Sequence, residues 1–216
     1  MLSGIKVRVN RGFTLVEVMI TVVIVAIGVA LAMPTWENAV QKRNVTSASE
    51  ELAAFIAHAQ TEAVRLNDVV SIVSKRSADG SDWCLGAIDG QTMADNGVSA
   101  CNCDFGSGSP LHCEVRGQRQ VLRDESFEYH SMESAMVGAT NNNSFSFRFD
   151  PIRGIKTNPS GSVVNVDHSF AVISENGKHK LQVEVSVTGR VRICSPLAAK
   201  AVPGYKSCCG GPIVAP

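Results

Sequence analysis

A long apolar run near the start of the chain, broken by one charged residue, restricts what the protein can fold into. Residues 13–33 read FTLVEVMITVVIVAIGVALAM, 21 residues in which Glu17 is the only charged side chain. At about 1.5 Å of rise per residue, a helix of this length spans a hydrocarbon layer of roughly 30 Å. Three basic residues and no acidic residue precede the run, which orients its N-terminal end towards the cytoplasm. The run therefore predicts one membrane-crossing helix.

A secretory signal peptide is one interpretation of such a run, but it requires a short apolar region followed by a small-residue cleavage site. Here the run is longer, and its end, ALAMPTW, matches such a site poorly. A plain membrane anchor agrees better with the length but leaves Glu17 unexplained. A carboxylate inside the hydrocarbon layer is energetically costly. It therefore indicates a functional residue whose charge is balanced by a specific partner.

The stretch RGFTLVE, residues 11–17, resembles the start of the type IV pilins and of the pseudopilins of type II secretion. In that family a prepilin peptidase cuts after the glycine, and the new N-terminal residue is methylated. The resemblance implies cleavage between Gly12 and Phe13, methylation of Phe13, and pairing of Glu17 with the N-terminal amine of a neighbouring subunit. Opposite charges attract strongly in a low-dielectric medium, so such a pair sets the register between packed helices.

The same resemblance implies a location and a set of partners. The precursor is a single-pass protein of the bacterial inner membrane with a periplasmic C-terminal head, and it is later assembled into a pilus or pseudopilus. Its partners are the lipid bilayer before assembly, the prepilin peptidase, an inner-membrane assembly platform and other pilin or pseudopilin subunits. Residues 1–12 are then a leader peptide, and residues 13–34 form the transmembrane and filament-core helix.

Apolar residues continue at helical spacing after Pro34, which lacks a backbone donor and is expected to bend or loosen the helix. Steps of three and four residues relate many of the apolar positions that follow, namely Trp36, Ala39, Val40, Leu52, Phe55, Ile56, Ala59, Ala63 and Leu66. Polar residues occupy the other positions. The pattern predicts an amphipathic helix over residues 35–67, with one side packed against a globular head formed by residues 68–216.

The remaining chain has the pattern of short strands. Residues 69–73 are a β-branched run, and residues 145–149 and 181–187 alternate between apolar and polar positions, as part of 163–166 also does. Asn176-Gly177 lies between two such runs and predicts a tight hairpin. Loop-rich composition marks residues 77–81, 89–108 and 138–143. The fold class expected is α+β, a long N-terminal helix packed on an antiparallel β-sheet head, as in pilins.

Further segments resemble one branch of the pilin family, the FimT/FimU/GspH group of minor pilins and pseudopilins. The segment SASEELAAFIAHAQTEAVRLNDVV, residues 47–70, is similar to that group's helix and first strand. FDPIRG at 149–154 and GRVRICSP at 189–196 are similar to its later strands, and GYKSC at 204–208 to its C-terminal end.

Seven cysteines favour an oxidising compartment. One cluster contains Cys84, Cys101, Cys103 and Cys113, and a second contains Cys194, Cys208 and Cys209. A zinc site at the first cluster is an alternative, with His112 as a further ligand, but the C-N-C spacing is not the usual one for zinc. We expect no metal and two disulfides in the first cluster, whose four cysteines allow three pairings. In the second, Cys194 is expected to pair with one of the two adjacent cysteines, for which we take Cys208.

Lys plus Arg and Asp plus Glu both number 20, so net charge indicates no partner. The distribution is uneven, because residues 178–206 carry six basic residues and one acidic residue, Glu184. The basic residues are Lys178, Lys180, Arg190, Arg192, Lys200 and Lys206. Residues two apart on a strand face the same side, so Arg190 and Arg192 would present two guanidinium groups, which suit phosphate.

A GRxR motif near the C-terminus also resembles the DNA-binding motif of FimT-type pilins, which implies double-stranded DNA as a candidate partner. The alternative is a solvated strand face, or arginines paired with acids such as Glu184. The five histidines show no metalloprotease motif or catalytic triad, and no phosphate-binding glycine loop follows a strand. We therefore expect no enzyme and no cofactor. Two function classes remain: a pilin that binds DNA, and a structural or priming pilin or H-type pseudopilin that does not.

Overall fold

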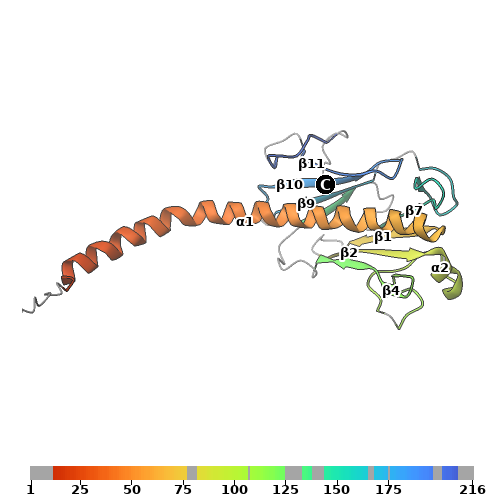
Figure 1. The fold of residues 1–216 in the computed structure, drawn as a ribbon, viewed down its shortest axis with the longest axis horizontal. Coiled ribbons are helices and arrows are strands. Elements are labelled where there is room, and N and C mark those ends of the chain that lie inside the picture. Colours follow the sequence, from red (N-terminus) through yellow and green to blue (C-terminus); the bar gives the residue numbers. More distant parts are fainter. Residues whose placement is uncertain are drawn as a thin grey trace, which may run out of the picture. The chain divides into compact units, whose positions relative to one another are not determined.

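The computed structural model of the protein describes residues 12–76, 82–106, 108–124, 133–137, 144–164, 168–174, 176–196 and 201–208. The chain divides into two compact units, residues 1–40 and residues 41–216. One helix, α1, contributes to both units and runs from Leu15–Leu66, 52 residues (Figure 1).

The part of α1 in the first unit is apolar and exposed. From Leu15 to Leu31 every residue is exposed, and an 18-residue window of the helix has a mean hydropathy of 2.7 with none of it buried. The helix is therefore long and apolar enough to cross a membrane, as the sequence predicts. Trp36, expected on the apolar face of the next segment, is 75% exposed, and Asn44 is the first buried residue of α1 among those whose burial is described.

The part of α1 in the second unit supplies one side of the core. Buried positions recur every three or four residues, at Val45, Ala48, Leu52, Ile56, Ala59 and Ala63. This spacing places them on one face of the helix. Burial of a valine, leucine or isoleucine side chain stabilises a fold by about 1.5–3 kcal/mol, and burial of an alanine contributes less. Leu52, Ile56, Ala59 and Ala63 confirm the face that the sequence predicts.

A five-stranded antiparallel sheet follows the helix. Its spatial order is β5 (Val121–Arg123), β2 (Trp83–Asp89), β1 (Val70–Arg76), β7 (Ser144–Phe149) and β8 (Lys156–Thr157). Ile72 on the central strand lies opposite Ala87 on one side and Phe147 on the other. All three side chains are buried in the core that α1 also lines. The β-branched run at 69–73 and the alternation at 145–149 therefore do mark strands.

A second antiparallel sheet has the order β11 (Val191–Cys194), β10 (Lys180–Val185), β9 (His168–Ile173) and β6 (Glu133–Val137). Phe170, Leu181 and Val183 join the same core as the first sheet and the helix. The head also contains a two-stranded ribbon, β3 (Glu114–Val115) and β4 (Gln118–Arg119). The expected fold class, a long N-terminal helix on antiparallel sheets, is confirmed.

The hairpin between β9 and β10 is at the predicted place but is wider than a two-residue turn. Ile173 pairs with Lys180, so the connection comprises residues 174–179. Side-chain hydrogen bonds hold it: His179 N donates to Ser174 Oγ at 2.9 Å, and Lys178 N donates to Asn176 Oδ1 at 3.0 Å. Gly177 has a φ of 63°, which glycine adopts at little cost.

The loop-rich segment at 89–108 contains a helix that composition did not predict, α2 (Gly90–Asn96). Asp89 caps it by accepting a hydrogen bond from Thr92 N at 2.6 Å, and Gly97 ends it with a φ of 65°. These two residues were the available sequence signals. The other expected loops, 77–81 and 138–143, lie outside the described residues.

Three disulfides brace the part of the head that the structure describes. The first cluster contains the pairs Cys84–Cys103 and Cys101–Cys113, one of the three pairings that the sequence left open. Because each of these sulfur atoms is bonded to another, none is available as a thiolate ligand for zinc. Cys194 pairs with Cys208, which joins the end of β11 to the C-terminal segment. Cys209 lies outside the described residues.

Candidate functional site: the N-terminal motif and the basic C-terminal end

The N-terminal motif lies at the start of α1. Gly12, Phe13 and Thr14 precede the first helical residue, and Phe13 is 82% exposed. Glu17 N donates a hydrogen bond to Thr14 Oγ1 at 3.2 Å, and Val18 N donates to Thr14 O at 3.2 Å. Thr14 is thus the N-cap, and Glu17 is the third helical residue, which is the spacing of a capping box.

This position gives Glu17 a local role that the sequence interpretation missed. The N-terminus of a helix carries a partial positive charge, which favours a carboxylate in the first turn. The TLVE spacing was the available signal. The side chain of Glu17 is nevertheless exposed, so its carboxylate is also accessible to a cation from outside the chain.

The GRVR motif spans the end of the turn between β10 and β11 and the start of β11. Arg192 lies directly opposite Glu184 on β10, and its guanidinium binds the Glu184 carboxylate through Nε at 2.8 Å and through Nη2. Arg190 precedes the strand, is exposed, and its backbone N donates to Ser186 Oγ at 3.1 Å. The two arginines therefore differ: Arg192 is paired with an acid within the sheet, the alternative that the sequence raised, while Arg190 faces solvent.

The glycine of this motif has a packing role. Gly189 is buried, has a φ of 78°, and a Cβ placed there would lie 2.3 Å from Gly154 O and 2.4 Å from Gln60 Nε2. Gln60 Nε2 in turn donates to Gly154 O at 2.7 Å. Asp150 Oδ1 shapes the turn that carries Gly154 by accepting from Arg153 N at 2.8 Å. The motif's backbone thus joins both sheets to α1, a contact between distant segments that no local pattern indicates.

The lysines do not gather around Arg190. Lys178 lies in the β9–β10 turn and is exposed, whereas Lys180 begins β10 and is buried. Arg190 lies beyond the opposite end of β10, roughly 20 Å away at 3.3 Å per residue. Lys206 is exposed, and its carbonyl accepts from Ser195 N, past the other end of β11. The described basic residues therefore do not form one patch, and Lys200 lies outside the described residues.

The chain thus combines three features: an N-terminal motif with one carboxylate, an apolar helix, and an antiparallel head braced by disulfides. These features define a pilin-like protein of the inner membrane. Residues 7–33 match the prokaryotic N-terminal methylation motif, and residues 48–189 match the family described as type II transport protein GspH. The chain belongs to this GspH family, within the FimT/FimU/GspH type of minor pilins and pseudopilins.

Two solved structures are similar to the chain. One is the type IV minor pilin FimU of Pseudomonas aeruginosa strain PAO1, with 18% identity over 76% of this chain and 95% of that chain, and a TM-score of 0.43. The other is the minor pseudopilin EpsH of the type 2 secretion system of Vibrio cholerae, with 9% identity over 72% of this chain and 99% of that chain, and a TM-score of 0.40. No curated protein matches the sequence significantly.

The prepilin-type motif together with the apolar helix indicates anchoring in the inner membrane with a periplasmic head, followed by incorporation into a pilus. Membership of the family further implies processing by prepilin peptidase and assembly with other pilin subunits.

Proposed function

We propose that the protein is a structural minor subunit of a type IV pilus or of a type II secretion pseudopilus. Prepilin peptidase cuts after Gly12, Phe13 becomes the methylated N-terminus, and the inner-membrane assembly platform inserts the subunit into the filament. Glu17 then pairs with the N-terminal amine of a neighbouring subunit. The observation that carries this proposal is a single exposed carboxylate in the first turn of an otherwise apolar, exposed helix segment.

Processing is tested by Gly12→Val, because a peptidase that requires glycine leaves this precursor uncut. Among the described residues nothing lies within 4 Å of a Cβ placed at Gly12 or at Gly28, so neither substitution disturbs packing within the chain. Gly28→Val is therefore the matched control and should be cut normally. Mass spectrometry of the purified chain reads the N-terminus. A mature chain beginning at Phe13 in Gly12→Val contradicts the proposed cleavage.

Assembly is tested by Glu17→Ala, with Glu37→Ala as the control at the next acidic residue of the helix. An uncompensated amine in a low-dielectric filament core is costly, so we expect incorporation of Glu17→Ala to fall by about tenfold or more. Membrane levels of the variant should stay normal. Immunoblots of sheared filaments against membrane fractions measure both quantities. Equal incorporation of the two variants contradicts the role of Glu17.

A second candidate function is binding of double-stranded DNA through the basic C-terminal end. The observation that favours it is Arg190, which is exposed and whose guanidinium makes no hydrogen bond or ion pair with the described part of the chain. Lys178 and Lys206 would add phosphate contacts at the far end of the sheet, and Lys200, outside the described residues, stays a further candidate from the sequence. Arg192 would contribute less, because its charge is balanced by Glu184.

The two candidates are separated by titrating the full chain in a neutral detergent with duplex DNA at two salt concentrations. Binding that weakens with salt and drops in Arg190→Gln supports a DNA receptor, since each lost phosphate contact reduces the salt dependence by about one unit of slope. Absence of binding by the disulfide-bonded chain leaves the structural role alone. Deletion in the host then separates pilus from secretion apparatus, by loss of surface pili or loss of exported protein.

A further inference from the structure

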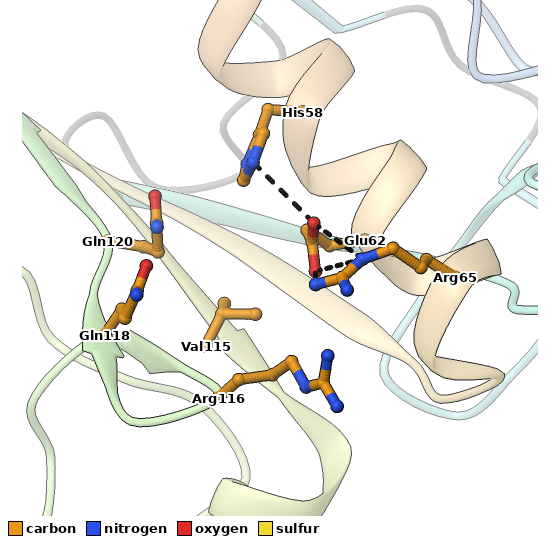
Figure 2. A pocket seen from close by; sticks show the side chains of 7 residues that line it. All are labelled: His58, Glu62, Arg65, Val115, Arg116, Gln118 and Gln120. Atoms are coloured by element: carbon orange, nitrogen blue, oxygen red, sulfur yellow. Dashed lines mark hydrogen bonds and ion pairs between the residues drawn. The ribbon is translucent and has the colours of Figure 1, made fainter.

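A polar cavity lies between the second-unit part of α1 and the β3–β4 hairpin (Figure 2). Its volume is about 290 Å³, and polar or charged side chains line most of it. The helix contributes His58, Glu62 and Arg65, and the hairpin region contributes Arg116, Gln118 and Gln120. We propose that this cavity binds a phosphate group. The proposal involves none of the residues of the GRVR motif.

The helix side of the cavity has its charges balanced internally. Arg65 binds the Glu62 carboxylate through Nε at 3.1 and 3.2 Å and through Nη2 at 2.5 Å. His58 Nε2 lies 3.7 Å from the same carboxylate. The hydrogen bond from Arg65 is the main cause that lowers the pKa of Glu62, so this carboxylate is ionised and neutralised at neutral pH. It therefore presents no uncompensated negative charge to an incoming anion.

On the hairpin side, Arg116, Gln118 and Gln120 supply hydrogen-bond donors to the cavity. Within the described residues, the guanidinium of Arg116 makes no hydrogen bond or ion pair, and the side-chain amides of Gln118 and Gln120 make none either. Figure 2 shows Glu62 and Arg65 pointing from the helix towards the hairpin, across from the two glutamines. With Glu62 and Arg65 cancelling, Arg116 supplies the remaining positive charge among the side chains that line this cavity.

The backbone at Arg116 is also unusual. The turn between β3 and β4 consists of Arg116 and Gly117, with φ values of 53° and 74°. Two-residue turns with positive φ at both positions strongly prefer Asn-Gly, and a long side chain at the first position is strained. Arg116 N donates to Asp89 Oδ2 at 2.7 Å, which helps to hold this conformation. The strain places a guanidinium beside the cavity where asparagine would suit the fold better.

The number and directions of the donors favour phosphate over a carboxylate. Donors come from the hairpin on one side and from His58 on the helix on the other, and a guanidinium can give two parallel hydrogen bonds to one phosphate. A tetrahedral phosphate offers acceptor oxygens in all these directions, whereas the two oxygens of a carboxylate lie in one plane. The same chemistry is found in inorganic phosphate, in the backbone of DNA and in the headgroup of phosphatidylglycerol.

The test is calorimetric titration of the full chain, in a neutral detergent at constant ionic strength, with inorganic phosphate against chloride. The decisive variant is Arg116→Asn, which removes the charged guanidinium and relieves the turn, so a loss of binding cannot be ascribed to unfolding. The matched control is Arg153→Gln, which removes an exposed arginine that neither binding proposal uses. We expect saturable phosphate binding, weakened about tenfold or more by Arg116→Asn, since a charged hydrogen-bond partner is lost, and unchanged by Arg153→Gln.

Parallel titrations with a short DNA duplex and with glycerophosphoglycerol, a soluble form of the phosphatidylglycerol headgroup, distinguish the sources. The source that binds most tightly with the same dependence on Arg116 is the ligand. Duplex binding that depends on Arg190 and not on Arg116 supports the second candidate function and overturns the cavity proposal for DNA. Absence of phosphate binding, or equal binding by Arg116→Asn and the unaltered chain, overturns the proposal altogether.

Discussion

The two parts of α1 are both rich in apolar residues, yet their surroundings are opposite. In the first unit, Ile24 is 64% exposed, whereas Ile56 in the second unit is fully buried against the sheets. An exposed apolar side chain on a helix of membrane length indicates an environment outside the chain, first lipid and then neighbouring helices. A buried side chain at helical spacing indicates the chain's own core. The two parts of α1 are therefore suited to different environments, one outside the chain and one inside its own core.

The largest expected difference between the two parts comes from truncating an isoleucine in each. Ile56→Ala should lower the free energy of unfolding of the head by about 3 kcal/mol, because it leaves a cavity in the core. Ile24→Ala should leave that free energy unchanged. Urea unfolding of the detergent-solubilised chain, followed by near-ultraviolet circular dichroism, measures both. Similar destabilisation by the two variants would mean that both parts of α1 contribute to the stability of the head.

The disulfides sharpen the comparison, because all seven cysteines follow α1 in the sequence. The Cys194–Cys208 bridge closes a segment with a sequence separation of 14. Replacing both residues by serine should destabilise the head by about 3 kcal/mol on the chain-entropy estimate. The same urea titration detects the loss, and membrane insertion of the variant should stay normal. A variant as stable as the unaltered chain would show that the bridge does not brace the head.

A smaller effect is expected where the second-unit part of α1 meets both sheets at Gly189. Gly189→Ala should cost about 2 kcal/mol or more, through its positive φ and through the contact with Gly154 O and Gln60. Gly161 is the matched control, with a φ of 82° and nothing within 4 Å among the described residues. Gly161→Ala should cost only about 1 kcal/mol, the backbone part. Equal losses of stability in the two variants would contradict the packing role of Gly189.

The smallest effect is a dependence of head stability on pH through His112. Its pKa is raised above 6.5, first by the hydrogen bond of Nδ1 to Ser109 O and then by that of Nε2 to the Glu114 carboxylate at 2.7 Å. The protonated form is thus favoured in the folded state. Its contribution is complete below pH 6.5 and is lost as pH rises through the raised pKa.

His112→Gln should flatten this part of the pH profile. Thermal unfolding of the unaltered chain and of the variant, measured at a series of pH values, gives both profiles. A profile that is unchanged by the substitution would assign the pH dependence to other groups.

Several parts of the fold were predictable because they depend on neighbours in the sequence. The spacing of Leu52, Ile56, Ala59 and Ala63 sets which helix face is buried, since helical geometry repeats every 3.6 residues. The alternation at 145–149 likewise marks a strand. The RGFTLVE motif indicates the class of protein, because processing is expected to read a short linear segment.

Other parts depended on contacts between distant segments. The sequence alone placed Arg190 and Arg192 together, but strand register sets Arg192 opposite Glu184 and leaves Arg190 in solvent. Composition left three pairings open for the first four cysteines, and chain folding chose one.

The sequence by itself determined a membrane-length helix with one carboxylate, an amphipathic continuation, a β-rich head and its membership of the pilin family, because each of these is written in local spacing. Only the tertiary structure decided that Gly189 packs on Gly154 and Gln60, and that Arg116 faces Glu62 and Arg65 across a cavity. These contacts join residues tens of positions apart. They arise when the sheets and the helix bury a common core, and no periodicity within one segment encodes them.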